Sequence, residues 1–530
     1  MAEFLFNQQS RTTNVLKASS IGTVCHLATS VLGFVYRTVF IAILSASFLG
    51  INGLFWNILS ILSLAELGIG GVIGYRFYKP IAENNVQRVG ALMAFFKQVY
   101  NLIAVVVLLS GLALFPFLDH LIKDPSSVPS GVNLHFIYLL YLAQSVVSYT
   151  LVYRLSIWSA DQKTYVGSFI QALSESFRFA MQILVLWVSS RVFKCSDALS
   201  FTLTLAANIV LTILINVLFS WWTTCRYRPV FEVEERIPRT ERIQIFKDAL
   251  ALMCHRIGGT VVNSTDTMVL AKFVGLAATG LYSNYYLLYK TVAQLFCRLF
   301  GGFTSSFGNA YAQLSHDEYY VVFRRMQFLT LGASGLVSAS LYLLIDDFIF
   351  LWIGPDMLLP KMTALVIALQ FYIITSRINA DISINATGLF VKDKLRPLIE
   401  SVLNLGLSIP LAIRYGVPGV FLGTILSCGL TVFWRVPYVL FRDALQKSVV
   451  HYWIQFLVYT VFTVAVVLVF RTAWLAWGPQ KMTWLIWILK ACLAVGFYLV
   501  AFVLAFGATA ESRYFVGRLR DRVKRGRGER

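Results

Sequence analysis

Apolar stretches of about helix length recur along almost the whole chain, from Val15 to Phe506, and short polar segments separate them. A helix needs about 20 apolar residues to cross a bilayer. The stretches are too uniformly apolar for the strands of an outer-membrane barrel, and an open sheet edge cannot lie in lipid. The pattern therefore predicts an all-α polytopic membrane protein with about 14 transmembrane helices. The predicted spans lie near residues 20–43, 52–75, 95–117, 134–157, 167–189, 198–222, 248–272, 280–304, 328–350, 359–382, 396–413, 417–440, 452–470 and 484–506.

Composition supports the same class of protein. Of 530 residues, 58% are hydrophobic and 13% are charged, and the mean hydropathy is +0.70. Soluble globular proteins are about 45–50% apolar and about 25% charged. These values exclude a water-soluble enzyme of ordinary type, a disordered chain and a disulfide scaffold. The seven cysteines are scattered without a CxxC pair, so we expect neither a metal site nor a cofactor.

The charge distribution predicts the orientation of the chain in the membrane. The net charge is +19, from 45 Lys and Arg against 26 Asp and Glu. With the N-terminus inside, the inner segments hold about four times as many basic residues as the outer ones, as the positive-inside rule requires. The polar start carries Arg11 and Lys17 and shows no cleavable signal. We therefore expect a multi-pass protein of the cytoplasmic membrane with both termini in the cytoplasm. The basic excess then needs no nucleic-acid partner.

An internal repeat indicates two halves. Ser47–Gly50 precedes Gly53–Asn57, and the similar segment Lys272–Gly275 precedes Gly280–Asn284, at an offset of 225 to 227 residues. Six spans separate the copies, so the halves have the same orientation, and in transporters built this way the substrate site lies between the halves. The predicted parts are an N-lobe at 1–225 (spans 1–6), a C-lobe at 226–445 (spans 7–12), two extra helices at 446–510 and a basic cytoplasmic tail at 511–530. The tail can lie on anionic lipids of the inner leaflet or stay in solvent.

Charged residues within the spans are costly in hydrocarbon and must pair, reach the interface or face a cavity. On one helix, Glu175 and Arg178 are three residues apart, and Arg377 and Asp381 are four apart, so each pair should meet. Lys490 and Arg435 are candidates to extend to the interface. The basic residues within or at the edge of spans are Arg37, Arg154, Arg178, Arg256, Lys272, Lys290, Arg298, Arg377, Arg435 and Lys490, and the acidic ones are Glu66, Glu175, Asp266 and Asp381.

The positive excess among these residues predicts an anionic substrate such as a phosphate or pyrophosphate, because the arginine fork binds phosphate oxygens in pairs. The candidate substrate-binding residues are Arg37, Arg154, Arg256 and Arg298. Glu66 and Asp266 are candidates for a coupling role or for a structural charge. For each of these residues, a purely structural ion pair stays open as the alternative. We assign no catalytic residue, since the chain has no Walker motif or phosphate-cradling loop.

Several motifs resemble the Wzx-type polysaccharide flippases of the multidrug/oligosaccharidyl-lipid/polysaccharide (MOP) exporter superfamily. The likeness lies at Arg37–Phe40, Leu49–Leu54, Leu64–Gly70, Tyr78–Ala82, Asp266–Gly275 and Gly280–Tyr285. The resemblance implies two pseudo-symmetric six-helix lobes around a central cavity, with two further helices here. It also implies a bacterial transporter, not an enzyme, that moves a polyprenyl-pyrophosphate-linked oligosaccharide from the inner to the outer leaflet for surface polysaccharide biosynthesis. Expected partners are this lipid-linked oligosaccharide, anionic membrane lipids, a polysaccharide polymerase and glycosyltransferases.

Two other functions stay open. An ion-coupled multidrug exporter of the same superfamily should have acids in its cavity, whereas the first span here carries Arg37 and no acid. A membrane-embedded glycosyltransferase or polymerase should have a catalytic acid or base on a sizeable loop, and the loops here are short.

Overall fold

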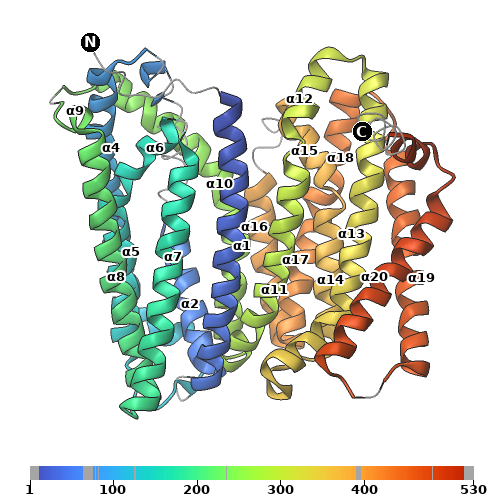
Figure 1. Ribbon diagram of the computed structural model, residues 1–530, viewed down its shortest axis with the longest axis horizontal. Coiled ribbons are helices and arrows are strands. Elements are labelled where there is room, and N and C mark those ends of the chain that lie inside the picture. The colour runs from blue at the N-terminus through green and yellow to red at the C-terminus, as the bar shows by residue number, and fades with distance from the viewer. Residues whose placement is uncertain are drawn as a thin grey trace, which may run out of the picture. The chain divides into compact units, whose positions relative to one another are not determined.

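The computed structural model describes residues 11–63, 76–77, 79–81, 83–124, 127–161, 163–233, 235–389, 396–479 and 481–518, and in this part the chain forms helices, turns and loops without a strand (Figure 1). Small polar residues start several helices. The Asn85 side chain accepts a hydrogen bond from the Arg88 amide, and Ser315 forms a capping box with Glu318. Such caps satisfy amide groups that a helix start would otherwise leave unpaired.

The chain divides into two compact units, Met1–Gly280 and Leu281–Arg530, which we call unit 1 and unit 2. The boundary falls inside a helix, α11 (Leu276–Gly301), four residues after its start. The division of the chain into lobes at residue 225 stays a prediction.

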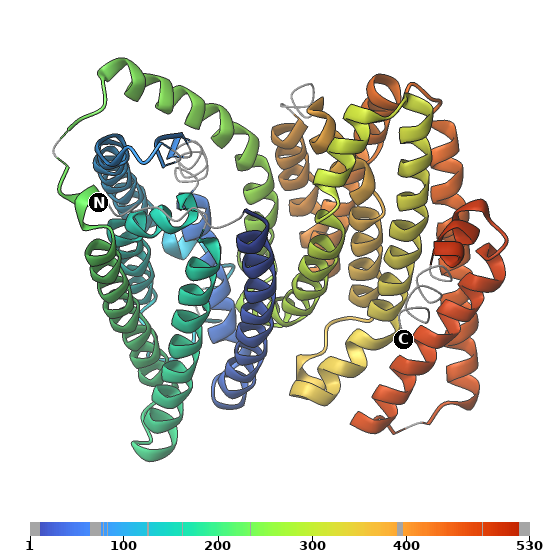
Figure 2. The same ribbon diagram turned by 45° about the horizontal axis from the view of Figure 1, so that its top comes forward.

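Unit 1 is a bundle of long helices. α1 packs on α7, α7 on α8, α8 on α5, α5 on α4, and α2 packs on both α5 and α10. α10 is a single helix of 35 residues that curves strongly along its length (Figure 2). The helices of unit 1 are α1 (Arg11–Ile43), α2 (Ala46–Leu62), α4 (Val86–Leu114), η2 (Phe115–Leu121), α5 (Leu134–Val152), η4 (Tyr153–Leu155), α6 (Ser156–Ala160), α7 (Thr164–Trp187), η5 (Val188–Val192), α8 (Asp197–Arg226), α9 (Arg228–Phe231) and α10 (Arg239–Phe273).

Aromatic side chains join the helices of unit 1. The Tyr36 ring of α1 lies 5.5 Å from the Phe179 ring of α7, and Phe48 of α2 lies 5.2 Å from Phe201 of α8. Such pairs contribute about 0.5–1.5 kcal/mol beyond the area that they bury. They supply directional packing in a bilayer, where the hydrophobic effect gives no preference for one helix over lipid.

Unit 2 holds the remaining helices. α16 packs on α17, α17 on α14, α14 on α13, and α13 also contacts α15, α19 and α20. After α11, its helices are α12 (Thr304–Gln313), α13 (His316–Ile353), η6 (Pro355–Met357), α14 (Met362–Thr375), α15 (Ile378–Thr387), α16 (Arg396–Tyr415), α17 (Val417–Leu430), α18 (Val432–Leu440), η8 (Phe441–Leu445), α19 (Val450–Trp477) and α20 (Trp484–Phe506).

The last two helices, α19 and α20, pack on α13 through two glycines. A Cβ at Gly332 would lie 2.7 Å from the Phe502 ring, and one at Gly335 would lie 2.1 Å from Tyr498 Oη. Tyr498 also shares a hydrogen bond of 3.2 Å with Thr463, which links α20 to α19. Small residues at such positions let helices approach closely in a membrane. The two extra helices are therefore an integral part of unit 2.

The start of the predicted tail packs on α13. Residues 510–518 are helical, and within them Glu511 forms an ion pair of 2.5 Å with Arg324. Arg325 lies 3.6 Å above the centre of the Tyr514 ring. The first turns of the tail thus have protein contacts. Residues 519–530 lie outside the described part, so lipid contact by the rest of the tail stays a prediction.

The predicted spans agree with the helices in type and place. Each one overlaps one to three consecutive helices of the described part. Within that part, nine helices are long and apolar enough to cross a membrane. Shorter apolar helices occupy Leu27–Ile43, Ala46–Leu62 and Leu134–Tyr149. The all-α, polytopic fold class is therefore confirmed, while the exact count of 14 spans stays a prediction.

Candidate functional site

Unit 1 contains a polar seam between α2 and α10, buried on the α10 side and half-buried on the α2 side. The Asn57 amide donates a hydrogen bond of 3.1 Å to Thr267 Oγ1, and Ser264 Oγ lies 3.5 Å from Ser60 Oγ. On each helix the two residues are three positions apart, so they share a face. Hydrogen bonds between such side chains hold helices together where no water is available. The seam fixes the position of the second half of α10 against α2.

Asp266 belongs to this region of α10. It is 5% exposed, and the buried residues Thr265 and Thr267 flank it in the sequence. A carboxylate at such a depth is expensive in a membrane and is a functional candidate by default. Asp266 is one of the two predicted coupling or structural charges, and it lies next to Thr267 of the α2–α10 seam.

Beyond the seam, toward the start of α2, the first turns of α2 and α11 cross with their backbones in contact. A Cβ at Gly50 would lie 2.1 Å from the Leu276 carbonyl oxygen, and a Cβ at Gly280 would lie 1.9 Å from the Ala46 carbonyl oxygen. The two contacts are reciprocal, because each helix contributes a glycine and the residue four positions before it. Both glycines belong to the motifs from which the internal repeat was predicted. Glycine is required here because any side chain would overlap the partner's backbone.

Arg37 lies on α1 and is half-buried. The neighbouring residues Gly33 and Tyr36 contact Phe179 of α7, which fixes the rotation of α1 in the bundle. A cationic side chain held at this depth can serve an anionic ligand or a structural partner. Its assignment to a substrate cavity stays a prediction.

Arg154 is half-buried and contacts three side chains of unit 1. Its guanidinium donates a hydrogen bond of 2.8 Å to Thr224 Oγ1 on α8 and one of 3.1 Å to the Tyr153 hydroxyl. It also lies 5.6 Å from the centre of the Phe231 ring on α9. These contacts fasten the end of α5 to α8 and α9. They favour the structural alternative for this residue over a role in substrate binding.

The other predicted site residues are distributed over the chain. Arg256 lies on α10, and its side chain is outside the described part, as is Glu66 altogether. Arg298 is exposed near the end of α11, in unit 2. A cavity shared by Arg37, Arg256 and Arg298 stays a prediction.

Unit 2 has its own buried polar network around α15. Arg377 Nη1 donates hydrogen bonds of 2.8 Å to both carboxylate oxygens of Asp381, which confirms the predicted pair. Beside it, the buried Asn379 amide donates to Gln327 of α13 at 3.0 Å. The other predicted pair, Glu175 with Arg178 on α7, is also confirmed, at a longer distance of 4.0 Å.

One prediction about the intramembrane charges is wrong. Lys490 does not extend to the interface: it is 8% exposed, and its Nζ lies 2.6 Å from a carboxylate oxygen of Asp347 on α13. Asp347 lies far from Lys490 in the sequence, so helical spacing could not reveal the pair. On the adjacent residue, Asp346, a carboxylate oxygen accepts a hydrogen bond of 2.8 Å from Tyr285. The ion pair between Lys490 and Asp347 also reduces the number of intramembrane cations that lack an acidic partner.

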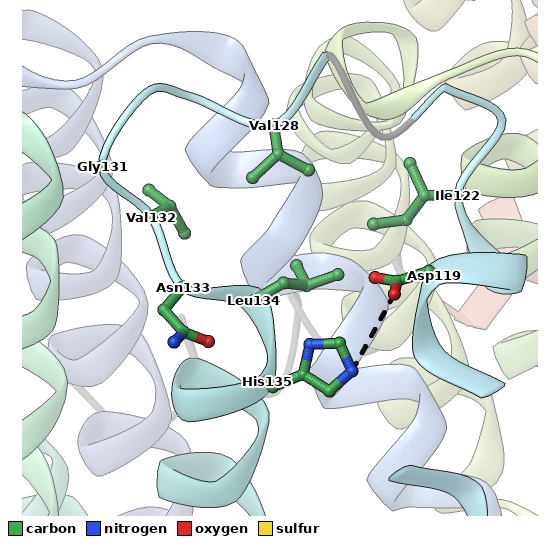
Figure 3. Close-up of a pocket in the computed structure, with 8 residues that line it drawn as sticks. All are labelled: Asp119, Ile122, Val128, Gly131, Val132, Asn133, Leu134 and His135. Carbon is green, nitrogen blue, oxygen red and sulfur yellow. Dashed lines mark ion pairs between the residues drawn. The ribbon is translucent and has the colours of Figure 1, made fainter. Parts of the chain in front are cut away.

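A polar cavity of about 540 Å³ lies between η2 and the start of α5, a part of the chain that the sequence analysis did not select. Figure 3 shows His135 and Asp119 pointing toward each other across it, with His135 Nε2 4.0 Å from Asp119 Oδ2. Asn133, which also lines the cavity, caps α5 by accepting a hydrogen bond from the Phe136 amide. Positive-inside topology would place this cavity on the outer side of the membrane.

No protein-family model and no curated protein sequence matches the chain. Solved structures are similar in fold. The lipid II flippase MurJ in an inward closed conformation has a TM-score of 0.68 at 12% identity, covering 92% of this chain and 98% of MurJ. A multidrug resistance MATE family transporter of the MOP superfamily, in its inward-facing conformation, has a TM-score of 0.54 at 12% identity, covering 82% of this chain and all of the other.

An outward-facing MATE structure gives a TM-score of 0.53 at 11% identity, with 84% of this chain and 98% of the other covered. At sequence identities of 11–12%, these similarities show a shared fold and not a shared function. The chain therefore has the helical fold that MurJ and the MATE transporters share.

Proposed function

We propose that this chain is a flippase that moves a polyprenyl-pyrophosphate-linked oligosaccharide from the inner to the outer leaflet of the cytoplasmic membrane. The observation that carries the proposal is the likeness in fold to the lipid II flippase MurJ over 92% of the chain. The MATE structures cover a smaller part, 82% and 84%. MurJ, which covers the larger part of the chain, is a lipid II flippase, and this supports a lipid-linked substrate. The motifs at Leu49–Leu54 and Asp266–Gly275 support it as well.

Alternating access is the mechanism that this fold supports best, because MATE structures of the same fold exist in inward-facing and outward-facing conformations. A cavity open to the cytoplasm would admit the headgroup while the lipid tail stays in the bilayer. Arginines would hold the pyrophosphate through paired hydrogen bonds. An interior-negative potential assists export, by about 2.3 kcal/mol for each negative charge moved across 100 mV.

The arginines provide the test of this mechanism. If Arg37, Arg256 and Arg298 bind pyrophosphate, replacement by alanine should reduce surface glycan while protein abundance changes little. Arg→Lys should restore only part of the export, since lysine keeps the charge and loses the fork. Surface glycan and membrane protein level are measured in the same cells.

Arg154→Ala serves as the contrasting variant, because its contacts with Thr224 and Phe231 are structural. It should lower protein abundance and glycan together. Normal glycan in cells whose protein lacks Arg37, Arg256 and Arg298 would remove these residues from the mechanism.

A multidrug exporter is the second candidate, and the likeness to the MATE structures favours it. In that function the buried carboxylate of Asp266 would bind a cation. Purified protein in liposomes separates the two functions. Transfer of a fluorescent lipid-linked oligosaccharide between leaflets supports the flippase, whereas uptake of an organic cation driven by an ion gradient, without lipid transfer, supports the exporter.

A further inference from the structure

A second cavity in unit 1 has a strongly basic lining. It has a volume of about 510 Å³ and lies between α4, the segment before α10 and the first turn of α10. Three cationic side chains line it, Lys97, Arg236 and Arg242, together with the polar residues Gln98 and Asn101. Two described carboxylates are sequence neighbours of these cations, Glu235 beside Arg236 and Glu241 beside Arg242, and neither lines the pocket.

The walls of this basic pocket are held by packing and by ion pairs. Gly90 of α4 leaves room for Val233, because a Cβ at position 90 would lie only 2.4 Å from the Val233 Cβ. Close by, Glu241 of α10 forms an ion pair with Arg88 of α4 and a longer one, of 3.9 Å, with Arg76. These contacts fix the segment before α10 on α4 and use the Glu241 carboxylate outside the pocket.

The three cations are available to a ligand. Within the part of the chain that the structure describes, Lys97, Arg236 and Arg242 form no ion pair. Arg242 is oriented by a hydrogen bond of 3.1 Å from its Nε to the Ile237 carbonyl and by the Phe95 ring, 5.8 Å away. An arginine held in this way keeps its two terminal nitrogens for an anion, and phosphate matches that fork.

The surroundings of the pocket are apolar and exposed, as a lipid chain requires. Along α4, Leu102, Val105 and Leu109 continue from Gln98 and Asn101 on the exposed side of the helix. On α10, Ile243 and Phe246 are also exposed beside the pocket. The first turns of α10 run across the ends of its neighbours before the helix turns along them, as an interfacial segment does (Figure 2).

We propose that the basic pocket binds the phosphate headgroup of an anionic phospholipid of the inner leaflet, with an acyl chain along the exposed side of α4. The three cations bind the phosphate, Gln98 and Asn101 face the glycerol region, and Leu102 and Val105 contact the chain. Basic pockets at the cytoplasmic ends of membrane helices bind anionic headgroups in this way. The site is distinct from the basic tail, and it does not depend on which substrate is transported.

Binding of phosphatidylglycerol to the purified full-length protein tests the proposal. Native mass spectrometry with phosphatidylglycerol and phosphatidylcholine gives the number of bound lipids and their affinities. The triple variant K97Q/R236Q/R242Q should bind its tightest phosphatidylglycerol on the order of 100-fold more weakly, since each lysine or arginine near anionic lipid contributes roughly fivefold. The charge-matched control R226Q/R239Q/K247Q removes three exposed cations that do not line the pocket and should bind like the wild type.

A second variant guards against loss of fold. Ala94 lines the pocket, and A94F fills it while keeping all three cations, so it should weaken phosphatidylglycerol binding with an unchanged melting temperature. Equal weakening in the control triple variant would overturn the proposal in favour of unspecific attraction.

Inorganic pyrophosphate and a polyprenyl pyrophosphate are the competing probes. Cation-dependent binding of pyrophosphate without phospholipid, or tighter binding of the polyprenyl lipid, would also overturn it.

Discussion

Gly50 lies where the backbone of α2 touches the backbone at the start of α11. We predict that Gly50→Ala destabilises the protein by about 1–3 kcal/mol, because the new methyl group must displace the Leu276 carbonyl. Gly53→Ala, on the same helix, is the matched control, since its Cβ would meet Thr267 at an ordinary 3.5 Å. Thermal unfolding in detergent measures both variants. Equal melting temperatures would show that the crossing tolerates a side chain.

Lys490 and Asp347 form a buried ion pair between α20 and α13. Lys490→Met leaves the Asp347 carboxylate without its cation, and such a break typically costs 3–5 kcal/mol. The double variant Lys490→Met with Asp347→Asn should recover a large part of the lost stability, because no uncompensated charge remains. A double-mutant cycle on the midpoint of unfolding measures the coupling. Additive losses would mean that the two residues do not stabilise each other.

These residues show which contacts a sequence can predict. Glu175 with Arg178 and Arg377 with Asp381 were predictable, because residues three or four apart on a helix share a face. Lys490 with Asp347 was not, because the pairing depends on how α20 packs on α13. The depth of Asp266 was predictable from hydropathy, whereas its position beside the α2–α10 seam needed the fold.

Among the helices, the docking of α19 and α20 on α13 depends on Gly335. We predict that Gly335→Leu separates these helices from α13, because the added side chain occupies the space of the Tyr498 and Thr463 hydroxyl groups. Limited proteolysis between α18 and α19 should then become faster. Gly496→Leu, on α20, is the control, since nothing lies within 4 Å of its Cβ position. Unchanged proteolysis of the Gly335 variant would contradict this role.

The existence of the helices followed from hydropathy, and their interruptions did not. The predicted span 359–382 is divided in the structure, where α14 ends at Thr375 and α15 begins at Ile378. No glycine or proline marks this break in the sequence, so apolar length alone gave one continuous helix. The predicted span 417–440 is likewise divided at Thr431, between α17 and α18, and here Gly429 lies two residues before the break. At the start of α15, a tertiary contact, the hydrogen bond from Asn379 to Gln327 of α13, accompanies the break between α14 and α15.

For the whole molecule, topology is the prediction that a single experiment can check. On a background without native cysteines, Asp356→Cys in η6 should react with a membrane-impermeant maleimide in intact cells, because charge bias places it outside. Arg239→Cys, at the start of α10, should react only after the membrane is opened. Strong labelling of Arg239→Cys in intact cells would reject the orientation proposed here.

The fold of the whole molecule was predictable only in outline. The motifs at Leu49–Leu54 and Gly280–Tyr285 resemble those of a transporter family, and the likeness to MurJ, at 12% identity, shows the helical fold alone. Lipid-facing positions accept almost any apolar residue, so sequences of such proteins diverge while helix packing is kept. The lobe boundary at residue 225, read from the polar segment at 226–238, stays a prediction, because the compact units that meet at Gly280 are defined by contacts and not by the repeat.

The reciprocal contact at Gly50 and Gly280 has a mechanical consequence. The chain passes from unit 1 to unit 2 inside α11, without a loop, and Gly280 on that helix touches the Ala46 carbonyl. We expect α11 to move as one stiff rod about the Ala46–Gly280 contact, because no loop interrupts it. Displacement along it grows with distance from that point, by about 1.5 Å of lever arm for each residue. Spectroscopic probes that report motion therefore belong near Gly301, at the far end of α11, and reference probes belong near Leu276.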